Sequence, residues 1–416
     1  MTPSGSAAEL RRTLGVGDAV VIGLGSMVGA GIFAALGPAA RAAGSGLLPG
    51  LAVAAVVAYC NAVSSARLAA RYPASGGTYV YGRERLGAFW GYLAGWAFVV
   101  GKTASCAAMA LTVGAYVWPA QAHAVAVAAV VVLTAVNYGG IHKSAWLTRA
   151  IVAVVLAVLA CVVVVCLGSD RADAGRLAFG ASEGAGGVLQ AAGLLFFAFA
   201  GYARIATLGE EVRDPAHTIP RAIPLALGIA LAVYVGVAVA VLSVLGPEAL
   251  GEAGAPLADA VRAAGGSGWV PVVRAGAAVA ALGSLLALIL GVSRTTLAMA
   301  RDRHLPVPLA AVHPRFRVPH RAELAVGAVV AVLAATVDVR GAIGFSSFGV
   351  LVYYAIANAS AWSLDPLPAA RVAPVVGFAG CAVLALSLPG GSVAVGAGVL
   401  AVGATAYGVR GWLGRL

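Results

Sequence analysis

The chain has 416 residues, of which 61% are hydrophobic and 10% are charged. Soluble domains carry about 25% charged residues, so this composition excludes a water-soluble globular protein and favours a chain surrounded by lipid. The formal net charge of +11 is not gathered into a basic helix face or a nucleic-acid-binding motif, so we expect no nucleic-acid partner.

About twelve apolar segments approach the ~20 residues that cross a bilayer. They cover residues 16–40, 47–70, 88–117, 122–140, 145–168, 187–211, 220–246, 269–299, 323–338, 341–363, 372–389 and 393–410. The sequence therefore predicts an all-α membrane protein with about 12 transmembrane helices, embedded in a lipid bilayer.

The first and the sixth segments each contain a break. The first break reads Gly25-Ser26-Met27-Val28-Gly29-Ala30-Gly31-Ile32-Phe33, and the second reads Phe196-Phe197-Ala198-Phe199-Ala200-Gly201-Tyr202. Unwound backbone at membrane depth is tolerated only where it is buried in protein or lines a cavity. Two breaks five segments apart are typical of transporters built from inverted repeats, with the substrate site at mid-membrane.

Arginine residues indicate the orientation of the chain. The stretch 301–322, which follows the eighth segment, contains Arg301, Arg303, Arg315, Arg317 and Arg321. Cytoplasmic loops carry an excess of Lys and Arg, so we expect this stretch, and with an even number of spans both termini, in the cytoplasm. The Ala-, Gly-, Val- and Arg-rich composition favours a bacterial inner membrane as the location of this multi-pass protein.

The sequence contains no pattern typical of a metal site, a cofactor site or an enzyme. The five cysteines lie in apolar runs without a CxxC pair, so we expect them to be buried packing residues. The histidines lie in loops or at segment ends, and no HExxH motif is present. We therefore expect no cofactor, no metal and no enzymatic activity.

Four passages resemble, in order, the amino acid–polyamine–organocation (APC) superfamily of permeases. The first break resembles the first-helix pattern GxxxGxGIF of that superfamily. The other three passages are RYPASGGTY at 71–79, FFAFAGYARIATLGEEVRDPAHTIPRAI at 196–223 and ARDRHLP at 300–306. Within the third passage, IATLGEEVRDP is most similar to the cationic amino acid transporter branch.

This resemblance implies a LeuT-type fold with a 5+5 inverted repeat, in which helices 1 and 6 are unwound at mid-membrane. The implied units are a cytoplasmic N-terminus at 1–15, repeat 1 at 16–168, repeat 2 at 187–363, helices 11 and 12 at 372–410 and a cytoplasmic C-terminus at 411–416. It also implies secondary active transport of amino acids by alternating access.

An amino acid substrate needs donors for its carboxylate and acceptors for its ammonium group, and broken helices supply both. The expected donors are backbone amides at Gly25, Ser26, Gly29, Ala30 and Gly31, and the expected acceptors are carbonyls at Met27, Phe197, Ala198 and Ala200. The resemblance places the two substrate groups at the same positions. The alternative interpretation is that the glycines serve close helix packing. Four aromatic residues are candidates to line or gate the pocket: Phe33, Phe197, Phe199 and Tyr202.

Charged residues inside the membrane are functional candidates. Many proton-coupled members of the family carry a lysine in helix 5, whereas this chain has Val155 at the corresponding position. Lys102 in the third segment is a candidate to replace it, because burial favours the neutral amine and so permits proton exchange. Alternatively, Lys102 neutralises a helix-break carbonyl or extends to the cytoplasm. Arg204 cannot carry a proton, so it is a candidate gate or structural partner.

Three further candidate residues lie elsewhere in the chain. Glu210 and Glu211 form part of an inner gate or an exposed helix end. Ser284 in the eighth segment falls near where sodium-coupled relatives of this fold place a hydroxyl ligand. It offers a single hydroxyl because its neighbour is Gly283, and a membrane-helix serine more often bonds its own i−4 carbonyl. We therefore expect sodium less than a proton as the coupled ion.

The pocket segments contain no carboxylate near their centres. Because an unpaired buried charge is costly, we expect a neutral amino acid as substrate and proton-coupled uptake as the mode of transport. Cationic amino acid or polyamine transport and obligate amino acid exchange remain alternatives. A non-transporting amino acid sensor and a membrane enzyme are the alternatives from other classes.

Overall fold

The computed structural model describes residues 14–72, 76–140, 145–178, 184–206, 212–364 and 367–413. Within these ranges the secondary structure is helical, apart from an isolated bridge between Leu14 and Val212. The helices are α1 (Val16–Met27), α2 (Ala30–Ala34), α3 (Leu36–Ala43), α4 (Leu47–Arg71), α5 (Thr78–Leu86), α6 (Ala88–Val117), α7 (Ala122–Tyr138), α8 (Ala145–Leu167), α9 (Ala185–Phe199), α10 (Ala203–Ala206), α11 (Pro215–Glu252), α12 (Pro256–Ala263), α13 (Val270–Arg301), α14 (His320–Thr336), α15 (Val339–Trp362), α16 (Pro368–Ser387) and α17 (Gly390–Leu413).

Eleven helical runs in the described residues are long and apolar enough to cross a membrane. α14, with 17 residues, lies between two of them and corresponds to the segment predicted at 323–338. The all-α membrane fold predicted from the sequence is thus confirmed. Some boundaries differ from the prediction: α11 begins at Pro215 and continues to Glu252, and it bends at Gly246, whose φ of 74° is readily accessible to glycine.

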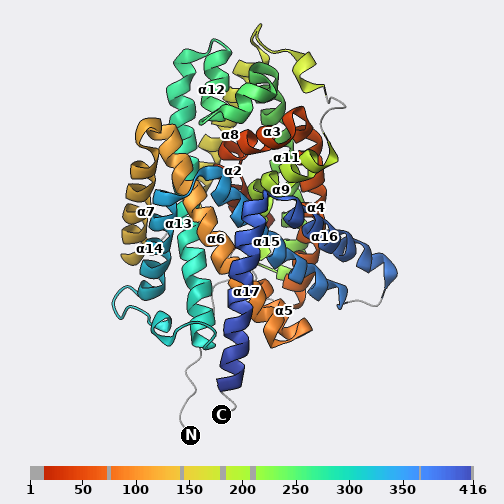
Figure 1. Cartoon of the computed structure of the whole chain (residues 1–416), viewed down its shortest axis with the longest axis vertical. Helices are drawn as coiled ribbons and strands as arrows, with labels where there is room; N and C mark the ends of the chain where they lie inside the picture. The colour runs from red at the N-terminus through yellow and green to blue at the C-terminus, as the bar shows by residue number, and fades with distance from the viewer. Residues whose placement is uncertain are drawn as a thin grey trace.

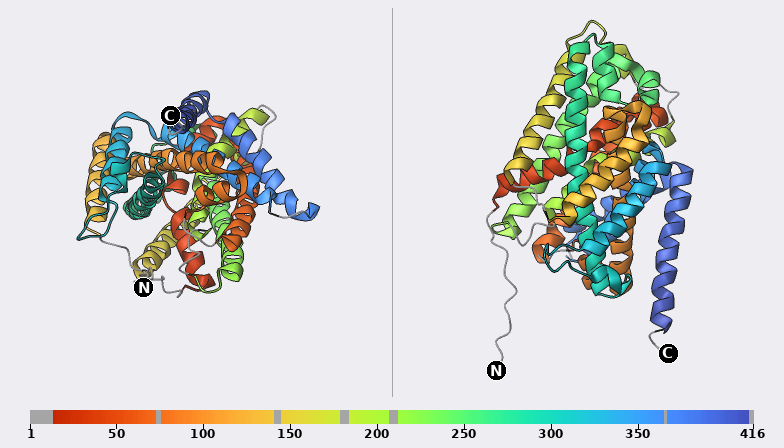
Figure 2. Two further views of the ribbon diagram at one scale, coloured as in Figure 1. Left: turned by 90° about the horizontal axis from the view of Figure 1, so that it is seen from below. Right: turned by 90° about the vertical axis from the view of Figure 1, so that its left-hand side faces the viewer.

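The helices form one elongated bundle (Figure 1). We call one end the α12 end, where α3 and α12 lie, and the other the α5 end, where α5 and the C-terminal part of α17 lie. Figure 2 shows α17 at the edge of the bundle, and its apolar stretch is only 11% buried. An apolar helix surface that is not covered by protein suits contact with lipid.

The centre of the bundle is built on α6 and α15, whose apolar stretches are each 78% buried. Their backbones meet at Gly101 and Gly349, where a Cβ atom added to Gly101 would lie 3.2 Å from the Gly349 Cα atom. One turn further on, the Ser105 and Ser346 hydroxyls are 2.5 Å apart. Small residues permit this close approach of membrane helices, and hydroxyl pairs add hydrogen bonds.

A buried polar network joins α4, α15 and α16. The Asn358 side-chain amide donates to the Asn61 side-chain oxygen at 2.6 Å, and the Ser64 hydroxyl donates to the Asn358 oxygen at 2.6 Å. The Cys381 thiol lies 3.3 Å from the Asn61 oxygen. All five cysteines are free, and four of them are buried, in agreement with their predicted role as packing residues.

Candidate functional site

The break in the first predicted segment is short. α1 ends at Met27, Val28 and Gly29 bend away, and α2 begins at Ala30. A bend at Ala35, whose backbone keeps right-handed helical dihedral angles, then leads into α3. The first amides of a helix have no intrahelical partner, and Ala30 and Gly31 are the first residues of α2, after its N-cap residue Gly29. Gly25 and Ser26 instead lie in the last turn of α1, where backbone amides belong to the helix ladder.

The break in the sixth predicted segment is a change of helix type. α9 runs through Phe197, Ala198 and Phe199, and a 3₁₀ turn then covers Ala200–Tyr202 before α10. The last carbonyls of an α-helix lack intrahelical donors. The end of α9 therefore presents acceptors next to the break in helix 1.

The two breaks are in direct backbone contact. A Cβ atom added to Gly31 would lie 2.6 Å from the Ala198 Cα atom, and one added to Gly201 would lie 2.2 Å from the Ser26 carbonyl oxygen. Side chains do not fit at such distances, so glycine is required at both positions. The sequence left close packing and a ligand site as alternatives for these glycines. The two are compatible, because glycines that allow the backbones to pack closely also leave the backbone amides and carbonyls uncovered by side chains.

Tyr234 of α11 joins the two breaks. Its fully buried hydroxyl lies 2.6 Å from the Met27 carbonyl oxygen and 2.9 Å from the Ala198 carbonyl oxygen, so its single proton is shared between these two acceptors. Its ring packs edge-on against Phe199, with the centroids 5.1 Å apart. Sequence reasoning did not select Tyr234; the available signal was a tyrosine in the middle of the otherwise apolar segment 220–246.

Lys102 of α6 contacts the break in helix 6. Its ammonium donates to the Ala200 carbonyl oxygen at 3.3 Å, and the Tyr354 hydroxyl of α15 lies 3.4 Å from the same oxygen. The side chain is buried, and no salt bridge to it is found among the described residues. Of the predicted arrangements for Lys102, the structure contains the contact with a helix-break carbonyl. Tyr354 also stacks on Tyr202, with the ring centroids 5.1 Å apart.

Ser284 of α13 faces the break in helix 1. A Cβ atom added to Gly29 would lie 2.0 Å from the Ser284 hydroxyl oxygen. This hydroxyl is buried and has no hydrogen-bond partner in the described part of the chain, so the i−4 bond considered from the sequence is not formed. A buried hydroxyl beside a helix break is free to bind a ligand or a cation.

The outcome differs among the remaining candidates. Arg204 lies exposed on α10, so its side chain is not buried at the break. Glu210 and Glu211 lie outside the described residues, as does the Pro73–Ser75 part of the second resembling passage.

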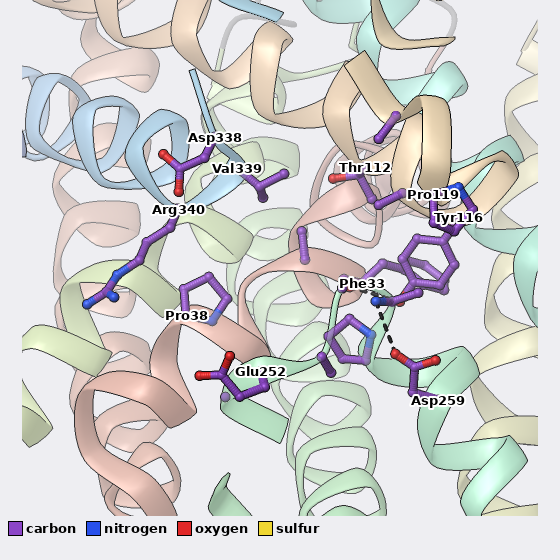
Figure 3. Close-up of a pocket in the computed structure, with 18 of the residues that line it drawn as sticks. Phe33, Pro38, Thr112, Tyr116, Pro119, Glu252, Asp259, Asp338, Val339 and Arg340 are labelled. Atoms are coloured by element: carbon purple, nitrogen blue, oxygen red, sulfur yellow. Dashed lines mark hydrogen bonds between the residues drawn. The ribbon is translucent and has the colours of Figure 1, made fainter. Parts of the chain in front are cut away.

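A cavity of about 520 Å³ opens beside this site at the α12 end (Figure 3). Its wall includes Phe33 and Tyr116, whose rings pack edge-on with the centroids 5.8 Å apart. The Tyr116 hydroxyl donates to the Phe33 carbonyl oxygen at 2.9 Å and accepts from the Leu257 amide at 3.3 Å. Phe33, a predicted gate residue, therefore lies between the cavity and the helix break.

The same cavity is lined by charges of both signs. Arg41 and Glu252 form an ion pair of 3.1 Å between α3 and α11. Asp259, Asp338 and Arg340 also line it, and Figure 3 shows Asp338 with Arg340 on one side and Asp259 on the other. A wall that carries both carboxylates and guanidinium groups is electrostatically suited to a zwitterion.

A second cluster lies at the α5 end. The Tyr79 hydroxyl of α5 donates to the Asp302 carboxylate at 2.5 Å and lies 2.9 Å from the His304 Nδ1 atom. Arg83 pairs with Asp302 at 3.3 Å, and the Tyr407 ring of α17 packs against His304. Burial lowers the pKa of His304, an effect that Asp302 opposes, so the neutral imidazole is the favoured form.

We expect this cluster to make the protein less thermally stable at acidic pH than at neutral pH. Because the pKa of His304 is lower in the folded state than its ordinary value of about 6.5, the folded state binds the proton less well. Protonation of His304 therefore costs no stability above about pH 6.5. Below that pH the protein loses stability, because the unfolded state binds the proton more readily than the folded state. Thermal unfolding in detergent should show a melting temperature reduced by about 2 °C at about pH 5.5 relative to about pH 7.5, and His304→Phe should reduce this difference. An equal decrease in the variant would contradict the assignment.

Comparison with known proteins is consistent with these features. The family model for amino acid permeases matches residues 18–374. An uncharacterized transporter of Mycobacterium tuberculosis strain H37Rv is 77% identical over 97% of this chain and 92% of its own length. Cationic amino acid transporter 6 of Arabidopsis thaliana is 30% identical over 85% of this chain and 66% of its own length. The methylthioribose transporter of Bacillus subtilis is 26% identical over 94% of this chain and 91% of its own length.

Proposed function

We propose that this chain, which belongs to the amino acid permease family, is a secondary transporter that carries a neutral amino acid across the membrane by alternating access. The observation that carries the proposal is the backbone contact between the two breaks, at Gly31 with Ala198 and at Gly201 with Ser26. At this point the start of α2 offers amides and the end of α9 offers carbonyls, which are the two groups that a zwitterion requires.

In this proposal the substrate carboxylate binds the amides of Gly29, Ala30 and Gly31. The substrate ammonium binds the carbonyl oxygens at the end of α9. The Ala198 carbonyl already accepts a hydrogen bond from Tyr234, but a carbonyl oxygen has two lone pairs and can accept a second donor. The Ala200 carbonyl is occupied by the Lys102 ammonium and is therefore not part of the proposed ammonium site. The polar cavity beside Phe33 is the route between this site and the solvent at the α12 end.

Lys102 supports a neutral substrate. Its ammonium lies at the Ala200 carbonyl, so a cationic substrate side chain bound nearby would experience like-charge repulsion in a medium of low dielectric constant. Some relatives are named cationic amino acid transporters, which makes a cationic amino acid the natural competing substrate. The unpaired lysine beside the break favours the neutral one.

We also propose that uptake is coupled to protons through Lys102. The charged amine holds the break of helix 6 to α6 through Ala200. Loss of the proton weakens this bond, because bonds from ionised donors are roughly twice as strong as neutral ones. Proton binding is in this way linked to the geometry of the break. Obligate exchange remains the runner-up, since it requires only the substrate site.

Orientation follows from charge placement. The basic residues Arg301, Arg303 and Arg410 lie at the α5 end, where the Arg410 guanidinium donates to the Arg303 carbonyl. Positive charge is enriched on the cytoplasmic side. We therefore propose that the α5 end faces the cytoplasm and the cavity at the α12 end faces outward, with a bacterial inner membrane as the location.

Replacing Lys102 tests the coupling. Arginine keeps the positive charge but cannot lose its proton, so Lys102→Arg is expected to lower proton-driven accumulation at least about tenfold. The measurement is uptake of radiolabelled amino acids into proteoliposomes with and without an inward proton gradient, with thermal unfolding as the check on folding. Undiminished proton-driven accumulation by Lys102→Arg would exclude Lys102 as the proton carrier.

The same assay, run with the wild type, separates the competing functions. Uptake that requires internal unlabelled amino acid would establish exchange in place of proton coupling. Preferential uptake of arginine or lysine would overturn the neutral substrate. Folded protein that transports no amino acid would favour a sensor or another substrate class.

A further inference from the structure

Glu323 is a buried carboxylate that the proposed mechanism does not use. It lies in the first turn of α14 and is 0% exposed. Neither of its carboxylate oxygens has a hydrogen-bond partner among the described residues. Polar groups that are buried in proteins are nearly always hydrogen-bonded, so an exception requires an explanation.

The register of α14 places Glu323 between α7 and α13. One turn further on, a Cβ atom added to Gly327 would lie 2.6 Å from the Thr134 hydroxyl oxygen of α7. Val326 belongs to the same apolar cluster as Val292 of α13. The neighbouring turn of α13 contains Thr296, whose buried hydroxyl, like that of Thr134, has no hydrogen-bond partner in the described chain.

Few charged or titratable groups lie towards Glu323. Arg294 of α13 lies two residues after Val292, which belongs to the same apolar cluster as Val326 of α14, and it is exposed. The titratable and charged groups on the elements packed against α14 are His123 and Tyr138 of α7, Tyr92, Lys102, Cys106 and Tyr116 of α6, Arg274, Arg294 and Arg301 of α13, His313 of the segment before α14, and His320 and Arg321 of α14 itself. The four residues of the 3₁₀ turn Val307–Ala310 contain no titratable side chain.

An ionised carboxylate without a partner is the costly form at this position. The penalty for burying an isolated ion is several kcal/mol, whereas a neutral carboxyl group avoids most of it. An ion pair with Arg294 is the other arrangement that satisfies the carboxylate, and the guanidinium is permanently charged. Two forms of the residue are therefore accessible: neutral without Arg294, and ionised with Arg294.

We propose that Glu323 is a proton-binding site of this transporter. In the conformation described here its carboxyl group holds a proton. When α13 moves so that Arg294 pairs with Glu323, the O–H bond breaks, the proton passes to water at the α5 end and the carboxylate remains paired with the guanidinium.

α13 connects this proton site to the substrate site. The same helix carries Ser284, which packs against Gly29 at the break in helix 1. The ten residues from Ser284 to Arg294 span about 15 Å of helix, and a continuous helix transmits a displacement between them. This link between proton and substrate rests on the proposed transport function, whereas proton binding at Glu323 does not.

The first test measures protonation directly and needs no transport. Infrared difference spectra of the purified protein between about pH 5 and about pH 8 detect protonated carboxyl groups. We expect a protonated carboxyl band near neutral pH in the wild type that is absent from Glu323→Gln, in which the amide replaces the acid. Glu84→Gln, which removes a partly exposed carboxylate of α5, is the matched control and should keep the band. A band that persists unchanged in Glu323→Gln would overturn the proposal.

A second variant tests the role of Arg294. Without the guanidinium the carboxylate has no counter-ion, so Arg294→Gln should extend the protonated band to higher pH than in the wild type. An unchanged titration would show that Arg294 is not the partner. If transport is observed, its dependence on pH should become flatter in Glu323→Gln. If the protein takes up no amino acid, the proposed transport function is contradicted. The infrared measurement then decides by itself whether Glu323 binds a proton.

Discussion

Replacing Gly201 by alanine is expected to abolish transport, with the initial rate of uptake reduced at least about 100-fold. The new Cβ atom would lie 2.2 Å from the Ser26 carbonyl oxygen and 2.7 Å from the Met27 amide nitrogen. Both neighbours are backbone atoms, so no side chain can rotate away, and the two breaks have to separate. Overpacking of this kind typically costs about 1–3 kcal/mol. A displacement of about 1 Å at a binding site can itself reduce a rate on the order of 100-fold.

The control for this substitution is Gly228→Ala in α11. No atom lies within 4 Å of a Cβ atom added at Gly228, and alanine is a better helix former than glycine. Uptake into proteoliposomes and thermal unfolding should both be measured for the two variants. Transport by Gly201→Ala at the rate of the control would show that the two breaks do not need their backbone contact.

The Tyr234→Phe variant is expected to be less stable and to transport poorly. It removes only the hydroxyl that donates to the Met27 and Ala198 carbonyl oxygens. A buried acceptor left without its donor costs about 1–3 kcal/mol, so the free energy of unfolding should fall by about 1–3 kcal/mol. Because the same bonds hold the two breaks together, uptake should fall on the order of tenfold or more.

Tyr59→Phe provides the comparison for this second prediction. Tyr59 lies on α4 and is 51% exposed, so loss of its hydroxyl removes no buried bond. Thermal unfolding in detergent and proteoliposome uptake distinguish the two tyrosines. If both variants behave like the wild type, the Tyr234 hydroxyl does not hold the breaks together.

The sequence was sufficient to predict the membrane helices and the region of each break, but not the atoms that meet there. Apolar length determines whether a helix spans the bilayer, and clusters of glycine mark where backbones approach closely. The first residue of α2 depends on contacts with α9 and α13, which are far away in the sequence. For the same reason the prediction included Gly25 and Ser26, which belong to α1.

Lys102 and Glu323 illustrate the same limit. A lysine inside an apolar segment was recognisable, and contact with a break carbonyl was one of its predicted roles, whereas the partner Ala200 lies 98 residues away. Glu323 stood at the predicted edge of an apolar segment. In the structure α14 begins earlier, at His320, and the burial of its first turn is produced by packing against α7 and α13. Burial of this kind comes from tertiary packing and not from local sequence pattern.

The hydroxyl of Tyr116 affects the balance between conformations at the α12 end of the protein. It connects α2, through the Phe33 carbonyl, with α12, through the Leu257 amide. A conformation in which α2 moves away from α12 loses at least one of these bonds. A bond worth about 1 kcal/mol changes the ratio of two conformations about fivefold. One hydroxyl group on α6 thus influences how often the cavity beside Phe33 can widen.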